Sequence, residues 1–439
     1  SKNPLLKKYE KSIDYLIKVA EVIETIWSQQ VYKDLSGIKF FPYDTTREEI
    51  MEQAESKPEL LDPFTIIKRI NGELVPIHYK EIYSAEIIRV SKYLSKAADE
   101  AKLAKNEKVA DYLSKLSNMF KKGEFERLEE LYMSADTSEL TVLVGPVETY
   151  MDSLLGIKKT FQMSVGLRNN KNKYQSLLDN FVDQKSLIKP IDSTINYVEA
   201  ENVSARIYDA VIFAGRLREF NISSMNIPNE IENVKKYGTK IELFTNSIDV
   251  RCSEFKKECM KYFSVQGMKC DKEKLEKGFF NMLALHGLVD GLIKYPKAHD
   301  RLGKHFDMVR ELNALLLASK SVLYNLLIGT LTSDDMKYFF TVFALYGLSV
   351  IKNRKKSFSV MQYAAGYILI FNYAIETGLL ELDKNGIKIN FEKITGLSNF
   401  STEILNIYAK GTDADIIRIY DEYGDFKAFD KFVAKIDGE

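Results

Sequence analysis

Apolar side chains recur at helical spacing along the first part of the chain. Over residues 4–33 they fall on one face of a helix, at Leu5, Leu6, Tyr9, Ile13, Leu16, Ile17, Ala20, Ile23 and Ile26. This pattern predicts an amphipathic helix. The same period returns from about Tyr83 to Tyr132 and again from about Ser253 to the C-terminus, so most of the chain is expected to be helical.

Segments of a different character lie between these helices. Two apolar runs, residues 64–67 and 74–77, flank Asn71-Gly72, which is typical of a β-hairpin. Residues 140–144 predict a short strand that ends at Gly145-Pro146, and short β-prone runs such as 210–214 and 240–244 follow. We therefore expect a predominantly helical α+β protein, with a mixed lobe over residues 1–240 built on a small β-core and an all-helical lobe over residues 241–439.

Composition narrows the function classes. Lys+Arg and Asp+Glu both number 62, so the net charge is zero, which argues against nucleic acid as the main partner. No stretch reaches the ~18 uncharged apolar residues of a membrane span, and Ser1 to Lys8 lack the hydrophobic core of a signal peptide. The odd set Cys252, Cys259 and Cys270, without C-x-x-C spacing, indicates reduced thiols. We expect a cytoplasmic protein with no membrane partner.

Two polar residues stand four apart in a predicted helix of the second half. His286 and Asp290 lie on the same helix face. In His-Glu-x-x-His hydrolases two imidazoles at this spacing bind zinc and the Glu is the general base. Here Gly287 stands at the Glu position and Asp290 at that of the second His. A glycine cannot take a proton from water, so this helix is expected to lack the chemistry.

Several separate segments carry a resemblance to one family. Residues 145–152 (GPVETYMD), followed by Gly156 and Lys158, resemble the Gly-x-x-Glu-x-Tyr-x-Asp segment of the dipeptidyl peptidase III family of zinc peptidases. Residues 226–229 (NIPN) resemble that family's Asn-x-Pro-Asn segment. Residues 40–49, residues 60–83 and Asn372-Tyr373 with Gly378 resemble its bacterial and archaeal branch. The matches keep the same order over nearly the whole chain.

The resemblance implies two lobes around a wide cleft, with zinc held in the helical lobe. The family's second zinc motif, Glu-Glu-x-x-Ala-Asp/Glu, falls by position on residues 317–322, where Leu317 or Ala318 stands in place of the ligand. Of the implied ligands only His286 is kept, with Asp290 as a weaker second. We therefore expect a degenerate member of the family, with no metal, no cofactor and no catalysis.

The residues that bind peptide in the family are better preserved. The resemblance implies that Glu148, Tyr150, Asn226 and Asn229 hold the N-terminal end of a peptide, since a carboxylate pairs with a protonated α-amine and amide side chains bond the first peptide groups. Residues 219–225 would offer a strand edge to which an extended peptide adds. Asn-Ile-Pro-Asn is equally a good turn, so these residues can also be purely structural.

Three hypotheses stay open at this point. The first is a pseudo-peptidase that binds peptide or protein segments without hydrolysis. The second is a structural or regulatory subunit that joins an active paralogue or a larger protein assembly. The third is a metallopeptidase with a rebuilt zinc site, for which His299, Asp300, His305, Asp307 and Glu311 lie close in sequence.

Overall fold

The computed structural model describes the whole chain except residues 1–2, 33–37, 137, 182–193, 221 and 439. It divides into two compact units, each assembled from separate stretches of sequence. Unit 1 comprises Ser1–Asn172, Arg206–Ile222 and Ile227–Asn233, and unit 2 comprises Lys173–Ala205, Ser223–Asn226 and Val234–Glu439. The fold class is α+β and predominantly helical, as the periodicity predicts. The division into lobes 1–240 and 241–439 stays a prediction.

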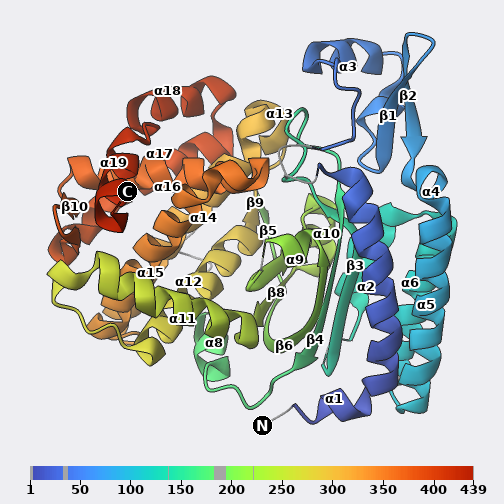
Figure 1. Cartoon of the computed structure of the whole chain (residues 1–439), viewed down its shortest axis with the longest axis horizontal. Coiled ribbons are helices and arrows are strands. Elements are labelled where there is room, and N and C mark those ends of the chain that lie inside the picture. Colours follow the sequence, from blue (N-terminus) through green and yellow to red (C-terminus); the bar gives the residue numbers. More distant parts are fainter. Residues whose placement is uncertain (1–2, 33–37, 137, 182–193, 221, 439) are drawn as a thin grey trace. The chain divides into compact units, whose positions relative to one another are not determined.

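Three long helices dominate unit 1. Helix α2 packs against α5, α5 packs against α6, and α2 also contacts strand β4 (Figure 1). Helix α2 buries its apolar face from Ile13 to Ile26, so the predicted amphipathic helix is confirmed, although a break at Tyr9 separates it from a short first helix. The helices of this unit are α1 (Leu5–Lys8), α2 (Glu10–Gln30), α3 (Arg47–Ala54), η1 (Pro58–Leu61), α4 (Tyr79–Ile82), α5 (Ser84–Leu103), α6 (Glu107–Lys122), η2 (Phe125–Arg127), α7 (Leu128–Ser134) and α9 (Arg216–Glu219).

An antiparallel sheet forms the β-core of unit 1. Strand β3 (Leu140–Glu148) pairs with β4 (Thr160–Arg168), and β4 pairs with β6 (Val203–Gly215). The prediction that β3 ends at Gly145-Pro146 is wrong, because the strand continues to Glu148 through a bulge between Pro146 and Glu148. A bulge and an edge position accommodate a proline, which has no N–H to give to a ladder. The strand therefore carries Glu148 at its very end.

The predicted hairpin is confirmed. Strands β1 (Thr65–Ile70) and β2 (Glu73–His78) pair in register around Asn71 and Gly72, both of which have positive φ (51° and 86°). Such a two-residue turn matches the twist of the strands. Next to this hairpin, the buried ammonium of Lys158 donates to Leu60 O (2.9 Å), Asp62 O (2.6 Å) and Thr65 Oγ1 (2.6 Å). Lys158 thereby ties the loop before β1 to the start of β4.

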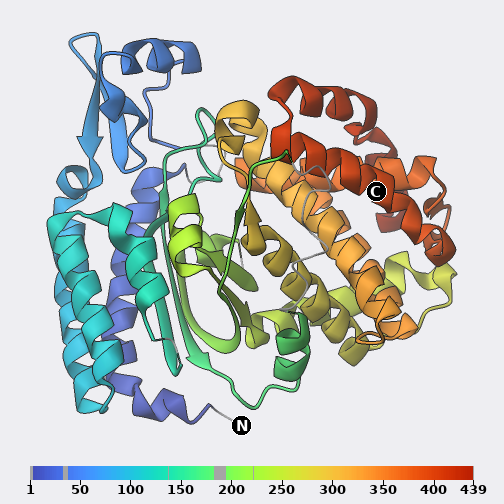
Figure 2. The same ribbon diagram turned by 180° about the vertical axis from the view of Figure 1, so that it is seen from behind.

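Unit 2 is a helical bundle with little sheet, coloured yellow to red after residue 245 (Figure 2). Helix α12 packs against α11, α14, α15 and strand β8, and α14 packs against α16 and α17. Its elements are α8 (Gln175–Phe181), β5 (Val198–Glu199), β7 (Ser224–Ile227), α10 (Ile231–Tyr237), β8 (Thr239–Phe244), α11 (Thr245–Tyr262), η4 (Ser264–Gln266), α12 (Lys272–Leu292), β9 (Ile293–Lys294), α13 (Ala298–Leu302), η5 (Gly303–His305), α14 (Phe306–Leu327), α15 (Ser333–Lys352), η6 (Arg354–Lys356), α16 (Phe358–Glu376), β10 (Leu380–Asp383), β11 (Gly386–Ile389), η7 (Phe391–Gly396), α17 (Leu397–Lys410), α18 (Asp413–Tyr423) and α19 (Lys427–Asp437).

Two details of this unit differ from the sequence prediction. The region after Ser253 is not all helix, because β10 and β11 form an antiparallel hairpin with Leu380 opposite Ile389. The expectation that no stretch is long and apolar enough for a membrane span is wrong for α16, which meets that test by length and composition. However, 56% of its most apolar window is buried inside the protein, as in a core helix.

Candidate functional site: a charge cluster on helices α12 and α14

Helices α12 and α14 bring a histidine and a glutamate together. His286 Nε2 lies 3.0 Å from Glu311 Oε2. The side chain of His286 is 23% exposed, whereas that of Glu311 is only 7% exposed. Because α12 and α14 pack side by side in unit 2, residues 25 positions apart in sequence become direct neighbours. A buried carboxylate of this kind needs a charged or hydrogen-bonding partner.

Glu311 is the residue that sequence reasoning did not pair with His286. The predicted equivalents of the second zinc motif, Leu317 and Ala318, also lie on α14, but both are buried apolar residues. A signal was present, because Glu311 and Ala314 repeat the Glu-x-x-Ala spacing inside the family's Glu-Glu-x-x-Ala motif, with Arg310 at the first Glu. The assignment of Leu317 or Ala318 to the ligand position stays a prediction.

Asp290 lies in the same cluster and has three polar neighbours. Its Oδ2 accepts a hydrogen bond from Asn226 Nδ2 (3.0 Å) and lies 3.5 Å from Lys294 Nζ. Its Oδ1 lies 3.7 Å from Arg310 Nε. The amide oxygen of Asn226 in turn accepts from Thr239 Oγ1 (2.6 Å). Two predicted site residues from different motifs, Asn226 and Asp290, are therefore joined directly.

Glycines let α12 approach the strands closely enough for these contacts. A Cβ on Gly291 would lie 2.6 Å from Thr239 Oγ1 and 2.7 Å from Asn226 Oδ1, so any side chain there would displace the hydrogen bond between them. A Cβ on Gly287 would lie 3.0 Å from Ile241 Cγ2 on β8. A β-carbon at Gly287, the predicted general-base position, would therefore require Ile241 to shift by a few tenths of an ångström.

Arg310 is the central cation of the cluster. Beyond Asp290, its guanidinium lies 3.6 Å from Glu311 Oε1 and 3.9 Å from Asp307 Oδ1. Its side chain is 7% exposed, and its guanidinium carbon lies 5.8 Å from the centre of the Phe306 ring. Burial and the aromatic ring hold this cation in place among three carboxylates.

The electrostatics of His286 follow from these neighbours. Burial opposes its protonation, but the hydrogen bond that its imidazole N–H donates to Glu311 and the charges of Glu311 and Asp290 outweigh burial and raise the pKa of His286 above its ordinary value. The neighbouring carboxylates therefore favour the protonated form of His286 over the neutral imidazole.

The residues of this cluster do not fit zinc. Zinc sites in hydrolases have about three protein ligands and an open position. Here two permanent cations, Arg310 and Lys294, lie within 4 Å of the carboxylates that a metal ion would need. Across the described part of the chain, no group of three or more His, Cys, Asp or Glu side chains is arranged to hold a metal ion.

The histidines considered for a rebuilt zinc site have separate surroundings. His305 Nδ1 contacts the carboxylate of Asp413 on α18. The ring of His299 packs against Phe306, with 5.3 Å between ring centres. His286 instead bonds Glu311, so the structure does not bring these three imidazoles together around one point.

In unit 1, Glu148 and Tyr150 follow each other at the end of β3. The carbonyl oxygen of Glu148 accepts from Thr160 Oγ1 (3.2 Å), while its half-buried carboxylate has no hydrogen-bond donor among the described residues. Tyr150 is buried, and the Arg216 guanidinium lies 4.6 Å from its ring centre. The Glu148 carboxylate can therefore accept further hydrogen bonds. The ring of Tyr150, in contrast, is buried and covered by Arg216.

Asn229 lies in a turn that a buried glutamate holds. Its backbone N donates to Glu129 Oε1 (2.9 Å), and the next backbone N, of Glu230, donates to Glu129 Oε2 (3.0 Å). The Glu230 side chain contacts Lys159 Nζ at 2.6 Å. Burial opposes the charge on Lys159, but Glu129, Glu230 and Glu148 outweigh it and raise the Lys159 pKa. Asn229 belongs to unit 1, whereas Asn226 belongs to unit 2.

The predicted strand edge at residues 219–225 is placed too early. Residues Arg216–Glu219 form the short helix α9, and the strand β7 spans Ser224–Ile227. Glycine at position 215 favours a turn here rather than a continuous strand, since its φ is +60°. Strand β7 has β8 as its one neighbour in the described sheet, so the edge itself is present.

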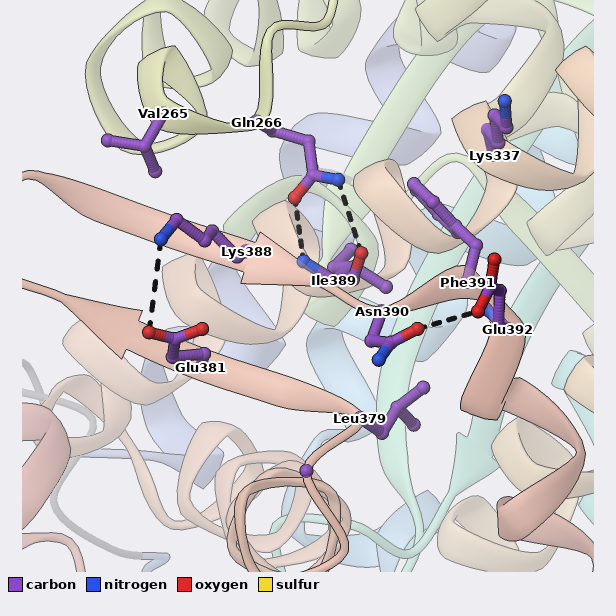
Figure 3. Close-up of a pocket in the computed structure, with 11 residues that line it drawn as sticks. Val265, Gln266, Lys337, Leu379, Glu381, Lys388, Ile389, Asn390, Phe391 and Glu392 are labelled. Atoms are coloured by element: carbon purple, nitrogen blue, oxygen red, sulfur yellow. Dashed lines mark hydrogen bonds and ion pairs between the residues drawn. The ribbon is translucent and has the colours of Figure 1, made fainter.

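A separate cavity of about 590 Å³ lies beside the β10–β11 hairpin (Figure 3). Gln266 bonds both the N–H (2.7 Å) and the carbonyl (3.1 Å) of Ile389, as a neighbouring strand would. Lys388 and Glu381 line the opposite side, 3.9 Å apart. None of the predicted site residues lines this cavity.

A curated protein and solved structures are similar to this chain. No protein-family model matches this chain. A curated protein from Arabidopsis thaliana, Nudix hydrolase 3, is 23% identical over 355 residues, which cover 78% of this chain but only 44% of that protein. The chain thus spans less than half the length of the curated relative.

Two solved structures are similar over nearly the whole chain. Dipeptidyl peptidase III from Caldithrix abyssi has a TM-score of 0.77 and 22% identity, covering 97% of this chain and 92% of that chain. Dipeptidyl-peptidase III from Corallococcus sp. strain EGB has a TM-score of 0.82 and 16% identity, covering 98% and 91%. This chain has a dipeptidyl-peptidase-III-like fold.

Proposed function

We propose that this chain is a catalytically inactive homologue of the zinc dipeptidyl peptidases, which binds the N-terminal end of a peptide or protein segment without cleaving it. The shared fold supports descent from a peptidase. In this proposal the residues that bind peptide lie mainly in a mixed lobe, residues 1–240, and the former zinc-site positions in a helical lobe, residues 241–439.

Gly287 and its contact with Ile241 support the loss of catalysis. Water needs a base to become a nucleophile at a metal, and Gly287 has no side chain that accepts a proton. The close Ile241 contact makes this glycine a packing position on α12. With Asp290 bonded to Asn226 and facing Lys294, the second ligand position serves a structural role as well.

Peptide binding rests on the carboxylate of Glu148. It is half-buried at the end of β3 and has no hydrogen-bond donor among the residues that the structure describes. A protonated α-amine is the donor that best matches such a group, since charge-assisted hydrogen bonds are the stronger class. Glu129 holds the Asn229 segment in place by accepting a hydrogen bond from the Asn229 backbone N–H.

A binding experiment tests this proposal. Isothermal titration with a short peptide should give binding when its N-terminus is free and at least tenfold weaker binding when the amine is acetylated. Glu148→Gln should remove the difference between the two peptides, whereas Glu126→Gln, at an exposed glutamate of the same unit, should preserve it. Equal affinity for both peptides, or cleavage of either one detected by mass spectrometry, would reject the proposal.

A second candidate is a structural or regulatory subunit of a protein assembly. The observation in its favour is an exposed apolar pair at the end of α14, Leu327 and Ile328, which are 84% and 54% exposed. Co-purification of a partner with the wild type, and its loss in a Leu327→Asp/Ile328→Asp variant, would favour this candidate over peptide binding. A cytoplasmic location stays a prediction in both cases.

A further inference from the structure

Two basic side chains lie within 4 Å of the carboxylates of the charge cluster. Asp290 lies between Lys294 (3.5 Å) and Arg310 (3.7 Å). Glu311 lies between His286 (3.0 Å) and the same Arg310 (3.6 Å). Arg310 therefore lies within 4 Å of both carboxylates, and largely buried charges of this kind need a partner of opposite charge.

We propose that Arg310, assisted by Lys294, supplies this positive charge in place of a divalent cation and thereby excludes metal ions from the His286, Asp290 and Glu311 side chains. The inference deepens the proposed function, since it rests on the absence of zinc catalysis, but it does not depend on peptide binding. Arg310 and Lys294 together carry the same formal charge as Zn²⁺, so the carboxylates are balanced without a metal.

Arg310 cannot leave the cluster easily. Its guanidinium also faces Asp307 at 3.9 Å, and its carbon lies over the Phe306 ring. Lys294 is likewise buried, in the short strand β9 that pairs with β5. A divalent cation entering between Asp290 and Glu311 would therefore meet two fixed cations at close range in a medium of low dielectric constant.

Removing the arginine charge should therefore open a metal site. Arg310→Gln keeps a shorter hydrogen-bonding side chain without the charge, and it should bind Zn²⁺ with at least about 100-fold higher affinity than the wild type. Arg310→Lys keeps the charge and should resemble the wild type. Lys294→Gln provides an independent route, and should raise zinc affinity even if Arg310→Gln does not fold.

The measurement is titration of each purified variant with Zn²⁺ against a chromophoric chelator, at a pH above the ordinary range of histidine. Co²⁺ in place of Zn²⁺ reports the ligand geometry by its visible spectrum, without any need for activity. Arg251→Gln, which removes an arginine paired with Glu254 on α11, is the matched control and should leave zinc affinity unchanged. In Arg310→Gln, a further His286→Ala change should abolish the site.

Two outcomes overturn the inference. One is stoichiometric zinc in the wild type that His286→Ala removes. The other is a folded Arg310→Gln and a folded Lys294→Gln that both bind zinc no better than the wild type. Wild-type zinc without peptide cleavage would reject this inference alone, whereas zinc with cleavage would reject the proposed function too.

Discussion

Glu311 Oε2 lies 3.0 Å from His286 Nε2, and this contact joins helices α14 and α12. The two residues come from segments that the sequence keeps apart, and both depend on Arg310 and Asp290 for their charge balance. Because His286 gains or loses a proton near its raised pKa, the strength of this contact depends on pH.

The first prediction concerns the pH response of this pair. Because the pKa of His286 is raised in the folded protein, the pair stabilises the fold below the ordinary histidine pKa, and this contribution is lost as pH rises through the raised value. Glu311→Gln should lower the His286 pKa and flatten this dependence. Two-dimensional NMR of the imidazole protons, with urea unfolding at several pH values, measures both. An unchanged His286 pKa in Glu311→Gln would contradict the assignment.

The second prediction concerns Gly287. Restoring the general base with Gly287→Glu should not restore hydrolysis, even with added zinc, because the added side chain meets Ile241 at 3.0 Å and no zinc site is available. The clash should cost about 1–3 kcal/mol of unfolding free energy. Gly287→Ala, which gains up to about 1 kcal/mol in helix propensity, separates the contact from the charge. Urea unfolding and a peptidase assay provide the measurements, and hydrolysis by Gly287→Glu would refute the prediction.

Much of the fold was accessible from the sequence because it follows from local periodicity. The apolar face of α2 and the Asn71-Gly72 turn are determined by residues that lie close together in the sequence, and both appear where expected. The end of β3 was missed because Gly145-Pro146 normally stops a strand, whereas here a bulge carries the strand on to Glu148. The β10–β11 hairpin was hidden inside a region of strong helical pattern.

The site was only partly accessible for a different reason. His286, Asp290 and Asn226 were each found by motif, but their contacts depend on how α12 packs against α14 and the strands. The number of residues between His286 and Glu311 decides which residue of α14 faces His286. A single sequence does not show whether a homologue has the same number. Arg310 carried no signal at all, since a cation at a ligand-rich position runs against the family motif.

The third prediction concerns Lys158. Lys158→Met should destabilise unit 1 by about 3 kcal/mol, because two backbone carbonyls and the Thr65 hydroxyl lose their donor inside the protein. Burial lowers the Lys158 pKa to about 8, so the ammonium is still charged at neutral pH. Lys171→Met, at an exposed lysine, should change stability by no more than about 0.5 kcal/mol. Equal stability of the two variants in urea unfolding would show that these bonds contribute nothing.

The last prediction concerns acid stability at the C-terminal helix. Asp437, whose side chain is 13% exposed, accepts from Lys261 Nζ (2.7 Å) and Lys352 Nζ (2.6 Å) and contacts the Tyr262 hydroxyl. Burial alone would raise its pKa, but these three donors outweigh burial and lower the pKa to about 2. The lowered pKa means that Asp437 stabilises the fold above pH 4 and loses this contribution, about 2 kcal/mol, as pH falls towards 2.

Asp437→Asn should therefore lower the unfolding free energy at neutral pH and make it less dependent on acid. The difference from the wild type should shrink between pH 4 and pH 2, because protonation of the wild-type carboxylate removes the same interactions. Asp421→Asn, at an exposed aspartate of α18, serves as the control. Urea unfolding followed by circular dichroism at each pH gives the comparison. A difference between Asp437→Asn and wild type that stays constant down to pH 2 would mean that the lysine contacts do not hold α19 in place.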